Sequence, residues 1–257
     1  MSWLKKLEIH TWRNAPACIL GAGPSLRLFD FSNISNCHLF SINSSILKTK
    51  WDIPGQADLM RVWISNDSLC RKWSYFDKVK SDICFKVVRD SWLKYQDELK
   101  DFIFFNPRKT REDIIEESDD GLLYNSSVPS AIDLAIKLGF KEIYLFGIDH
   151  ITENEKSHFW QFLSLKDQPK ERISNGKTNI YLMPTKIMQP VSMQKNVWNM
   201  NIDVFKSLNN YANSKNVKII NVNDKKNSIP FEHKKFETTN LKNYGIIRLP
   251  ISKPASK

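Results

Sequence analysis

A glycine-rich loop is the first part of this 257-residue chain whose residue types point to chemistry. An apolar run, ACIL (17–20), leads directly into GAGPS (21–25), and the pattern then turns helical. Glycines let a backbone approach a ligand closely, a proline stiffens the turn, and amides at the start of a helical segment are free to bind an anion. Such a turn after a buried strand is where α/β proteins hold phosphates. We therefore predict that four loop residues bind a nucleotide: Gly21, Gly23, Pro24 and Ser25.

Two better-known phosphate motifs do not fit this loop. The dinucleotide-binding fingerprint has a third glycine, where this sequence has Leu26. It also has an acidic residue at the end of the second strand, where this sequence has Asn43. A P-loop needs Gly-Lys-Ser/Thr, and no such triplet follows. We therefore expect neither NAD or FAD binding nor P-loop chemistry.

The elements that must position the loop are short apolar strands. Near-continuous apolar runs suit strands that are buried on both faces of a parallel sheet. Such runs occupy 17–20, 38–43, 59–65, 83–88, 102–105, 143–149 and 217–223. The linking segments are long enough for crossover helices, and the clearest helix begins at Ser127 and ends at Gly139. The predicted fold class is α/β: a single Rossmann-like domain with a mostly parallel sheet, helices on both faces and a late lid.

The domain organisation follows from the same pattern. We assign the whole chain, 1–257, to one nucleotide-binding domain. Residues 152–199 are polar and irregular with three prolines, and so long a loop is usually a functional lid. A helix is expected at about 200–213. The last segment, 224–257, is predicted to be a basic tail that is poorly ordered at its end.

The basic tail is the main asymmetry of charge in the chain. From Lys206 to the end there are eleven Lys or Arg and three acidic residues, a net charge of +8 within a total of +10. Such a region attracts phosphates, whether of a nucleotide donor, a nucleic acid or an anionic membrane. The alternative is a solvated basic surface without a partner.

Polar residues at the predicted strand ends form a second candidate group. Ligands of parallel sheets bind beyond the carboxyl ends of the strands, and three of these ends carry an asparagine. Amides suit a sugar hydroxyl, a ribose or a base edge better than a metal ion. The alternative is that asparagine simply favours turns. On this rule the nucleotide site also includes Asn43, Ser44, Asn66 and Gly147.

Two histidines and a carboxylate are the candidates for catalysis. A neutral histidine at physiological pH can take the proton of a reacting hydroxyl group. The candidates are His158, at the start of the lid, and Asp149 with His150, at a strand end. The alternative for His150 is a strand-end residue bonded to the backbone. Two histidines without a third ligand do not predict zinc, and Asp119-Asp120 lacks the Asp-x-Asp spacing of a metal clamp, so we expect transfer without a metal or other cofactor.

Three motifs together resemble a known family. They are ILGAGPSLRLFDFSNI (19–34), FSINSSI (40–46) and SSVPSAIDLAIKLGFKEIYLFGIDH (126–150). In this order and spacing they are similar to bacterial sialyltransferases that use CMP-sialic acid. They are also similar to the related motility-accessory-factor group, which includes archaeal hydroxymethylpterin pyrophosphokinases. The resemblance covers residues 18 to about 158.

The resemblance implies a nucleotide-sugar donor and adds one residue to the site. The loop Gly21–Ser25 and Asn43 would hold the cytidine monophosphate part of the donor, and Ser127 matches the family serine at the start of the helix. Ala22 stands where the sialyltransferases have asparagine. Their lid histidine has no counterpart in MQKNVWNMN (193–201). The expected function is transfer of a sugar from a nucleotide donor to a hydroxyl acceptor such as a glycan.

Two other functions remain open on the sequence. A pterin-type pyrophosphokinase would use ATP and Mg²⁺ held by carboxylates such as Asp67 and Asp149. A nucleic-acid-associated enzyme would dock through the basic tail, with a DNA base as the sugar acceptor. The same tail would also suit an anionic membrane surface.

The cellular location is predicted from cysteines and hydropathy. Four cysteines are scattered without a Cys-x-x-Cys pair, which indicates buried thiols in a reducing compartment. No run of about eighteen apolar residues occurs, and the first residues lack the apolar centre of a signal peptide. We expect a cytoplasmic protein, with a peripheral position at the inner membrane surface as the alternative.

Overall fold

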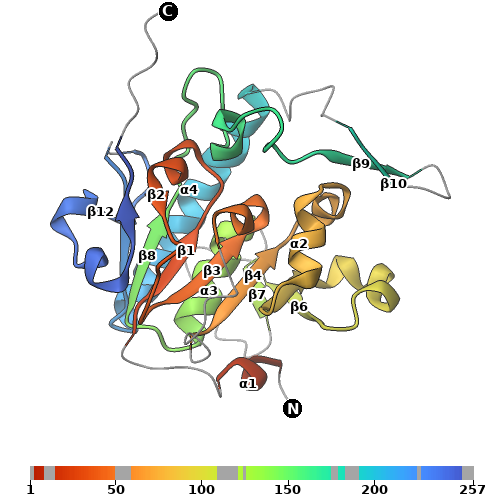
Figure 1. Cartoon of the computed structure of the whole chain (residues 1–257). Helices are drawn as coiled ribbons and strands as arrows, with labels where there is room; N and C mark the ends of the chain where they lie inside the picture. The colour runs from red at the N-terminus through yellow and green to blue at the C-terminus, as the bar shows by residue number, and fades with distance from the viewer. Residues whose placement is uncertain are drawn as a thin grey trace, which may run out of the picture.

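A parallel β-sheet forms the centre of the molecule (Figure 1). The structure is a computed structural model that describes residues 3–8, 15–49, 59–108, 121–123, 126–174, 179–182, 191–224 and 227–250. Within these residues nine strands form the sheet in the order β12-β11-β8-β1-β3-β4-β5-β6-β7, and every neighbouring pair is parallel. The strands are β1 (Ala17–Leu20), β3 (His38–Ile42), β4 (Arg61–Ser65), β5 (Phe85–Arg89), β6 (Phe102–Arg108), β7 (Gly121–Leu123), β8 (Glu142–Phe146), β11 (Lys218–Val222) and β12 (Glu232–Lys234).

The central strands are apolar on both faces because both faces are covered. Side chains alternate along a strand, so Ala17 and Ile19 of β1 join one core, whereas Cys18 and Leu20 join the other. The first core packs against α1 (Trp3–Glu8), α3 (Ser127–Lys137) and α4 (Val191–Ser214). The second packs against α2 (Tyr75–Ser81) and the 3₁₀ helices η1 (Pro24–Leu28), η2 (Asn43–Lys48), η3 (Ser68–Lys72), η4 (Asp90–Glu98), η5 (Phe159–Phe162), η6 (Phe236–Thr238) and η7 (Leu241–Tyr244). The predicted α/β fold class is confirmed.

The lid predicted at 152–199 is shorter in the structure. Helix α4 begins at Val191 and not near residue 200, so the last part of the predicted lid belongs to this helix. An amphipathic helix needs apolar residues on one side alone, so exposed polar residues such as Asn199 do not interrupt it. Before it, β9 (Glu171–Ser174) and β10 (Asn179–Leu182) form an antiparallel hairpin that projects from the body of the molecule (Figure 1).

The segment predicted as a basic tail from 224 is folded as far as Pro250. It adds β12 to the edge of the sheet, and β13 (Ile247–Arg248) pairs antiparallel with β2 (Phe29–Asp30). The reason is a set of apolar residues spaced among the lysines. They are buried against the second face of the sheet or beside α4, and they are Phe231, Phe236, Leu241 and Ile246. Residues 251–257 lie outside the described part.

Several positive charges of this region are paired with carboxylates. Glu232 lies between Lys218 and Lys234 at 3.3 Å from each ammonium, and Arg248 pairs with both Asp224 and Glu237. The basic character read from the sequence is therefore partly neutralised on the surface. None of the described helices is long and apolar enough to cross a membrane.

Candidate functional site

The order of the strands sets where a ligand would bind. After β1 the chain adds β3, β4, β5, β6 and β7 in turn on one side of β1. It then returns and adds β8, β11 and β12 on the other side. In open α/β sheets, ligands bind at such a switch point, beyond the carboxyl ends of the strands. The loops Gly21–Ser25 and Gly147–His150 leave β1 and β8 here, and β3 and β4 end next to them. We call this side of the sheet the carboxyl edge.

The two loops at the switch point are bonded directly to each other. The Gly21 amide donates to the Phe146 carbonyl at 2.7 Å, and the Gly23 amide donates to the Gly147 carbonyl at 2.8 Å. A Cβ at Gly21 would lie 2.5 Å from the Gly147 oxygen, and one at Gly23 would lie 2.6 Å from an Asp149 carboxylate oxygen. The glycines are therefore required for the contact between two loops, a role that the sequence did not reveal.

Asp149 fixes the glycine-rich loop. Its buried carboxylate accepts the Ser25 amide at 2.7 Å, the Ser25 hydroxyl at 2.5 Å and the Asn223 side-chain amide at 2.7 Å. Burial raises the pKa of Asp149, and the bonds from Ser25 and the charge of Arg27 act in the opposite direction. A carboxylate so fully engaged positions the loop around it.

The amides of this loop are mostly used within the protein. The expectation of free amides at Ser25 and Leu26 is wrong, because Ser25 donates to Asp149 and Leu26 donates to the Gly23 carbonyl. Pro24 has no amide hydrogen. In the described residues, Ala22 is left as the loop amide that has no protein acceptor. A ligand would therefore meet the loop at Ala22.

Asn43 is the predicted residue with the most unusual environment. It follows β3 with φ +51°, in the left-handed region, and its carbonyl accepts the Trp63 indole N–H at 2.9 Å. Its side-chain oxygen Oδ1 is buried and has no hydrogen-bond partner among the described residues. Ser44, next to it, is buried as well. A buried acceptor without a donor costs free energy unless a ligand or water supplies one.

The end of β4 is joined to the start of α3. The Asn66 amide donates to the Ser127 hydroxyl at 2.9 Å, and the Asn66 side chain donates to Ser130 Oγ at 2.9 Å. The structure thus brings together Asn66 and Ser127, two predicted site residues that are 61 positions apart. Ser126, which precedes the helix, has a buried hydroxyl without a partner in the described part of the chain.

His158 lies against the glycine-rich loop. The next residue, Phe159, donates its amide to the Ala22 carbonyl at 2.9 Å. Nδ1 of His158 lies 2.8 Å from the Ser157 hydroxyl, which leaves Nε2 as the ring nitrogen for other chemistry. Burial lowers the pKa of His158 to about 4, so the ring is neutral at physiological pH.

His150 lies on the other side of the switch point, against α4. Its φ is +52°, its ring stacks on Trp198 with centroids 5.8 Å apart, and the tilted ring of Phe205 lies 5.4 Å away. Nδ1 of His150 is buried without a partner among the described residues, and burial lowers the pKa to about 4. Both histidines are thus neutral, but they belong to different walls of the site.

Asn223 and Asn227 are site residues that sequence reasoning missed. Asn223, at the end of β11, donates to Asp149, and Asn227 donates to the carbonyls of Ile148 and Asp149 at 3.1 and 3.0 Å. The rule that strand ends carry the site would have found Asn223, since the predicted strand 217–223 ends there. Asn106 follows the predicted strand 102–105 and was expected at this edge by the same rule, but it lies inside β6 and not after it.

Metal ligands and reactive thiols are not gathered at this edge. In the ranges that the structure describes, no group of three His, Cys, Asp or Glu is placed to hold a metal ion. Asp67, one of the carboxylates considered for Mg²⁺, accepts the Leu69 amide at the start of η3. Cys18 and Cys37 are fully buried with their sulfurs 3.8 Å apart, and burial raises the pKa of Cys18. Asp119 and Asp120 lie outside the described residues.

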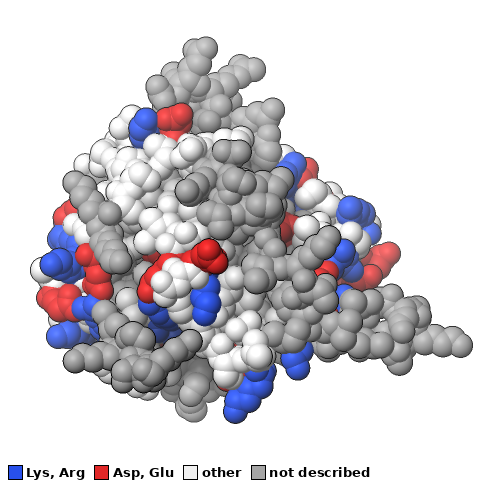
Figure 2. Space-filling view, turned by 90° about the horizontal axis from the view of Figure 1, so that it is seen from above, with Lys and Arg blue, Asp and Glu red and all other residues white. Residues whose placement is uncertain are grey.

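The surface above the strand ends is largely uncharged. Figure 2 shows the molecule from above, the side toward which the strands of Figure 1 run. Among the described residues in this view many are neutral, and acidic and basic side chains lie beside each other both near the middle of the face and at its periphery. On this face the described residues give no extended field of positive charge of the kind that holds a nucleic-acid backbone.

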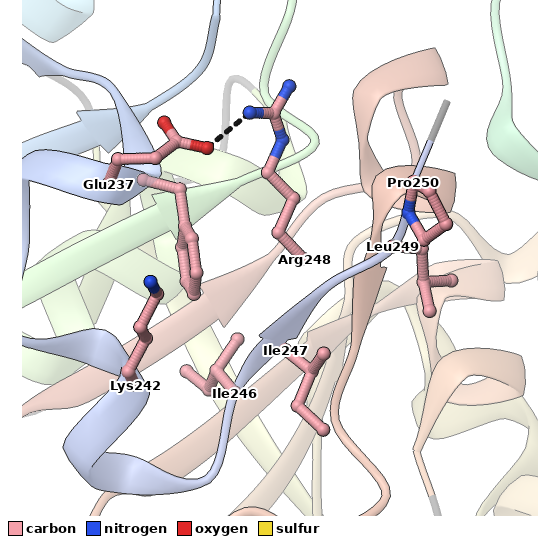
Figure 3. A pocket seen from close by; sticks show the side chains of 8 residues that line it. Glu237, Lys242, Ile246, Ile247, Arg248, Leu249 and Pro250 are labelled. Atoms are coloured by element: carbon pink, nitrogen blue, oxygen red, sulfur yellow. Dashed lines mark hydrogen bonds and ion pairs between the residues drawn. The ribbon is translucent and has the colours of Figure 1, made fainter. Parts of the chain in front are cut away.

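A separate cavity lies under the C-terminal segment (Figure 3). Its volume is ≈ 760 Å³, and its wall is mainly apolar, with the Arg248–Glu237 ion pair at one side. The residues that line it are Phe236, Glu237, Lys242, Ile246, Ile247, Arg248, Leu249 and Pro250. It contains none of the residues predicted to bind the nucleotide or to act in catalysis.

Fold and site together define an α/β protein of the Rossmann-like type with a polar site at the switch point. No family model matches the chain, and no curated protein matches it. Solved structures are similar to it. The monofunctional α-2,3-sialyltransferase Cst-I from Campylobacter jejuni is 17% identical, with 86% of this chain and 82% of that chain covered and a TM-score of 0.47.

Structures of a second sialyltransferase from the same organism are also similar. CstII in complex with CMP-3FNeuAc is 15% identical, with 91% of this chain and 86% of that chain covered and a TM-score of 0.39. CstII with a trisaccharide acceptor and CMP is 17% identical, with 89% and 84% covered and a TM-score of 0.29. These enzymes are of the group that the three sequence motifs resemble. At such identities and TM-scores, the activity of this chain has to follow from its own residues.

Proposed function

We propose that this chain transfers a sugar from a nucleotide-activated donor to a hydroxyl acceptor at the carboxyl edge. The observation that carries the proposal is Asn43. A residue held in the left-handed conformation with a buried, unpartnered acceptor is costly, and such cost is found where a ligand completes the structure. Asn43 stands between the ends of β1 and β4, in the middle of the polar groups described above.

The donor nucleotide is proposed to lie across the ends of β1, β3 and β4. Asn43 Oδ1 would accept from a ribose hydroxyl or a base amino group, and the Ala22 amide would donate to a phosphate oxygen. Gly21, Gly23, Pro24 and Ser25 would form the wall that carries Ala22, with Gly147 and Asp149 behind it. Ser44, Asn66 and Ser127 would form the opposite wall.

His158 is our choice for the general base. An acceptor oxygen attacks the anomeric carbon, the bond from that carbon to the donor phosphate breaks, and the proton of the acceptor hydroxyl passes to Nε2 of His158. The nucleotide leaves with the bonding electron pair. A phosphate near the ring would raise the pKa of His158 from about 4 toward neutrality, which makes it a better base in the complex than in the free protein.

Asp149 and His150 take supporting roles in this proposal. Asp149 has its oxygens engaged by Ser25 and Asn223, so it positions the loop and does not receive the proton. His150, stacked on Trp198, offers Nδ1 as an acceptor for a hydroxyl of the sugar. We propose that transfer proceeds without a metal ion, since the nucleotide walls are formed by neutral amides, hydroxyls and imidazoles.

A panel of nucleotides tests the proposal. The melting temperature of the whole protein is measured with CMP, UDP, GDP, their sugar conjugates and ATP, each with and without Mg²⁺. A ligand that binds only the folded state stabilises it by mass action and so raises the melting temperature. At a concentration of a hundred times its Kd, the gain in the free energy of unfolding is about 2.7 kcal/mol. We expect stabilisation by one class of sugar nucleotide without metal. Stabilisation by ATP with Mg²⁺ alone would replace the proposal with pyrophosphoryl transfer.

A further inference from the structure

The segment that carries His158 is fastened at two points. We call residues Glu153–Glu171 the strap. It follows the Gly147–His150 loop, contains η5 and runs on to the first strand of the projecting hairpin. Its middle is bonded to the glycine-rich loop through Phe159 and Ala22. The strap was predicted as part of a lid, and its contacts show how it is held.

Arg27 holds the first end of the strap. One guanidinium nitrogen donates to the Pro24 carbonyl at 2.7 Å, and the other donates to the Glu153 carboxylate at 2.6 Å. The guanidinium also lies over the ring of Phe162, 4.2 Å from its centroid. Arg27 belongs to η1, the helix after the glycine-rich loop, and it therefore joins this helix to Glu153 and Phe162, which lie on either side of His158 in the chain.

Ser74 and Trp73 hold the second end. The Ser74 amide donates to the Lys170 carbonyl at 2.8 Å, and the Lys170 amide donates to the Ser74 hydroxyl at 2.9 Å. The ring of Trp73 lies 5.7 Å from that of Trp160, which lies 5.7 Å from that of His158. An unbroken row of aromatic rings thus connects the second fastening to the histidine.

We propose that Arg27 is a positioning residue that clasps the strap to the glycine-rich loop and so places His158 over the nucleotide site. The proposal rests on the proposed function in one respect, the role of His158 as the base. Both terminal nitrogens of Arg27 are engaged by protein oxygens, so its task is to hold the strap and not to bind the phosphate. The strap is then a fixed wall of the site.

The molecule contains a matched control for the Arg27 clasp. Arg71 donates to Glu98 at 2.7 Å and lies over the ring of Tyr95 at 3.5 Å, and its side chain is 21% exposed compared with 22% for Arg27. Arg71 contacts neither the strap nor the glycine-rich loop through these bonds. Arg27→Gln and Arg71→Gln therefore remove similar ion pairs and ring contacts, but one alone releases the strap.

The test is the titration of His158, followed by NMR in the protein without substrate. In the wild type we expect titration near the pKa of about 4 that burial produces, and in Arg27→Gln a pKa that moves toward 6.5. Arg71→Gln leaves it unchanged, and His150 serves as an internal reference in every sample. His158→Gln assigns the signal. Hydrogen exchange of the Phe159 amide reports release of the strap directly. We expect faster exchange in Arg27→Gln and no change in Arg71→Gln.

The variant Glu153→Gln shows whether a change in the pKa of His158 comes from release of the strap or from the loss of a nearby charge. Loss of the Arg27 cation raises the pKa of a neighbouring histidine, whereas loss of the Glu153 anion lowers it. Release of the strap raises the pKa in both variants, because the ring then meets water. Shifts of opposite sign in the two variants, with Phe159 exchange as in Arg71→Gln, would overturn the proposal.

Turnover supplies a second readout once a donor is known. We expect kcat of Arg27→Gln to fall roughly 10- to 100-fold, with the donor KM changed much less, because the base is misplaced while the nucleotide walls stay intact. An equal loss in Arg71→Gln would contradict this role. A nucleotide panel without any stabilisation would refute the proposed function, whereas the titration and exchange results would still decide the clasp.

Discussion

The two ends of strand β3 carry asparagines in nearly the same backbone conformation. Asn36, before the strand, has φ +54°, and Asn43, after it, has φ +51°. Asparagine tolerates the left-handed region better than most residues, so the backbone alone does not distinguish them. Asn36 is exposed to water, whereas Asn43 has a buried side-chain oxygen without a partner in the described residues. The two asparagines therefore differ in the burial and bonding of their side chains and not in backbone conformation.

Two glycines show the same contrast between the edges of the sheet. Gly139 ends α3 at the amino edge with φ +87°, and a Cβ there would meet nothing within 4 Å. Gly147 follows β8 at the carboxyl edge with φ +63°, and a Cβ there would lie 2.7 Å from Cβ of Leu26. One glycine serves a local turn, and the other allows two loops of the site to touch.

Among the variants of the carboxyl edge, we expect Asp149→Asn to have the largest effect on stability and nucleotide affinity. The amide would present N–H groups to donors that Asp149 now satisfies, at a cost of about 3 kcal/mol in the free energy of unfolding. Nucleotide affinity should fall at least roughly tenfold, because the loop at Ala22 is no longer fixed. Urea unfolding and calorimetric titration measure the two quantities.

A core variant separates these two effects of Asp149→Asn. Val79→Ala removes fully buried methyl groups from α2 and should cost about 2 kcal/mol without changing nucleotide affinity. Equal losses of affinity in both variants would show that the effect of Asp149 is general destabilisation.

Gly147→Ala should cost more stability than Gly139→Ala. Both variants place an alanine in the left-handed region, so that strain is common to them. The contact with Leu26 adds about 1–3 kcal/mol at Gly147 alone. The difference between the two free energies of unfolding, measured in urea, isolates this contact. Equal destabilisation would mean that the loops at the carboxyl edge separate easily.

Stability is also expected to depend on pH. Burial lowers the pKa of His158 from 6.5 to about 4, so between these values the unfolded chain binds a proton that the folded chain does not. The contribution to stability is therefore complete above pH 6.5 and is lost as the pH falls toward 4. His158→Asn should show a shallower fall of melting temperature over this window. Parallel curves would show that His158 is protonated equally in both states.

Much of the sheet was predictable from the sequence, because strands that are buried on both faces form near-continuous apolar runs. β1, β3, β4 and β11 all fall within predicted runs, and β8 begins one residue before its run. Helix α3 was recognised from a cap predicted at Ser127 and a stop at Gly139, although Ser126 is the residue that precedes the helix. The short strands β7 and β12 were missed, since three residues carry no period. The folded C-terminal segment was missed because its apolar residues stand singly among lysines.

The sequence predicted which positions lie at the candidate site, but not which residues contact one another there. The strand-end rule pointed to Asn43, Asn66 and Gly147 without regard to what each would touch. That Ser25 donates to Asp149, 124 residues away, follows from the strand order and not from any local spacing. For the same reason the clasp from Arg27 to Glu153 had no signal in the sequence.

The most direct test of the proposed nucleotide site is nucleotide binding by Asn43→Ala and Asn36→Ala, compared with the wild type by calorimetric titration. Both variants replace a left-handed asparagine that flanks the same strand, so they share the cost to the backbone. We predict that Asn43→Ala weakens binding roughly 10-fold or more, as expected for loss of a buried hydrogen bond of about 1.5 kcal/mol, and that Asn36→Ala leaves it unchanged. Equal affinity of all three proteins would contradict a nucleotide site at the carboxyl end of β3.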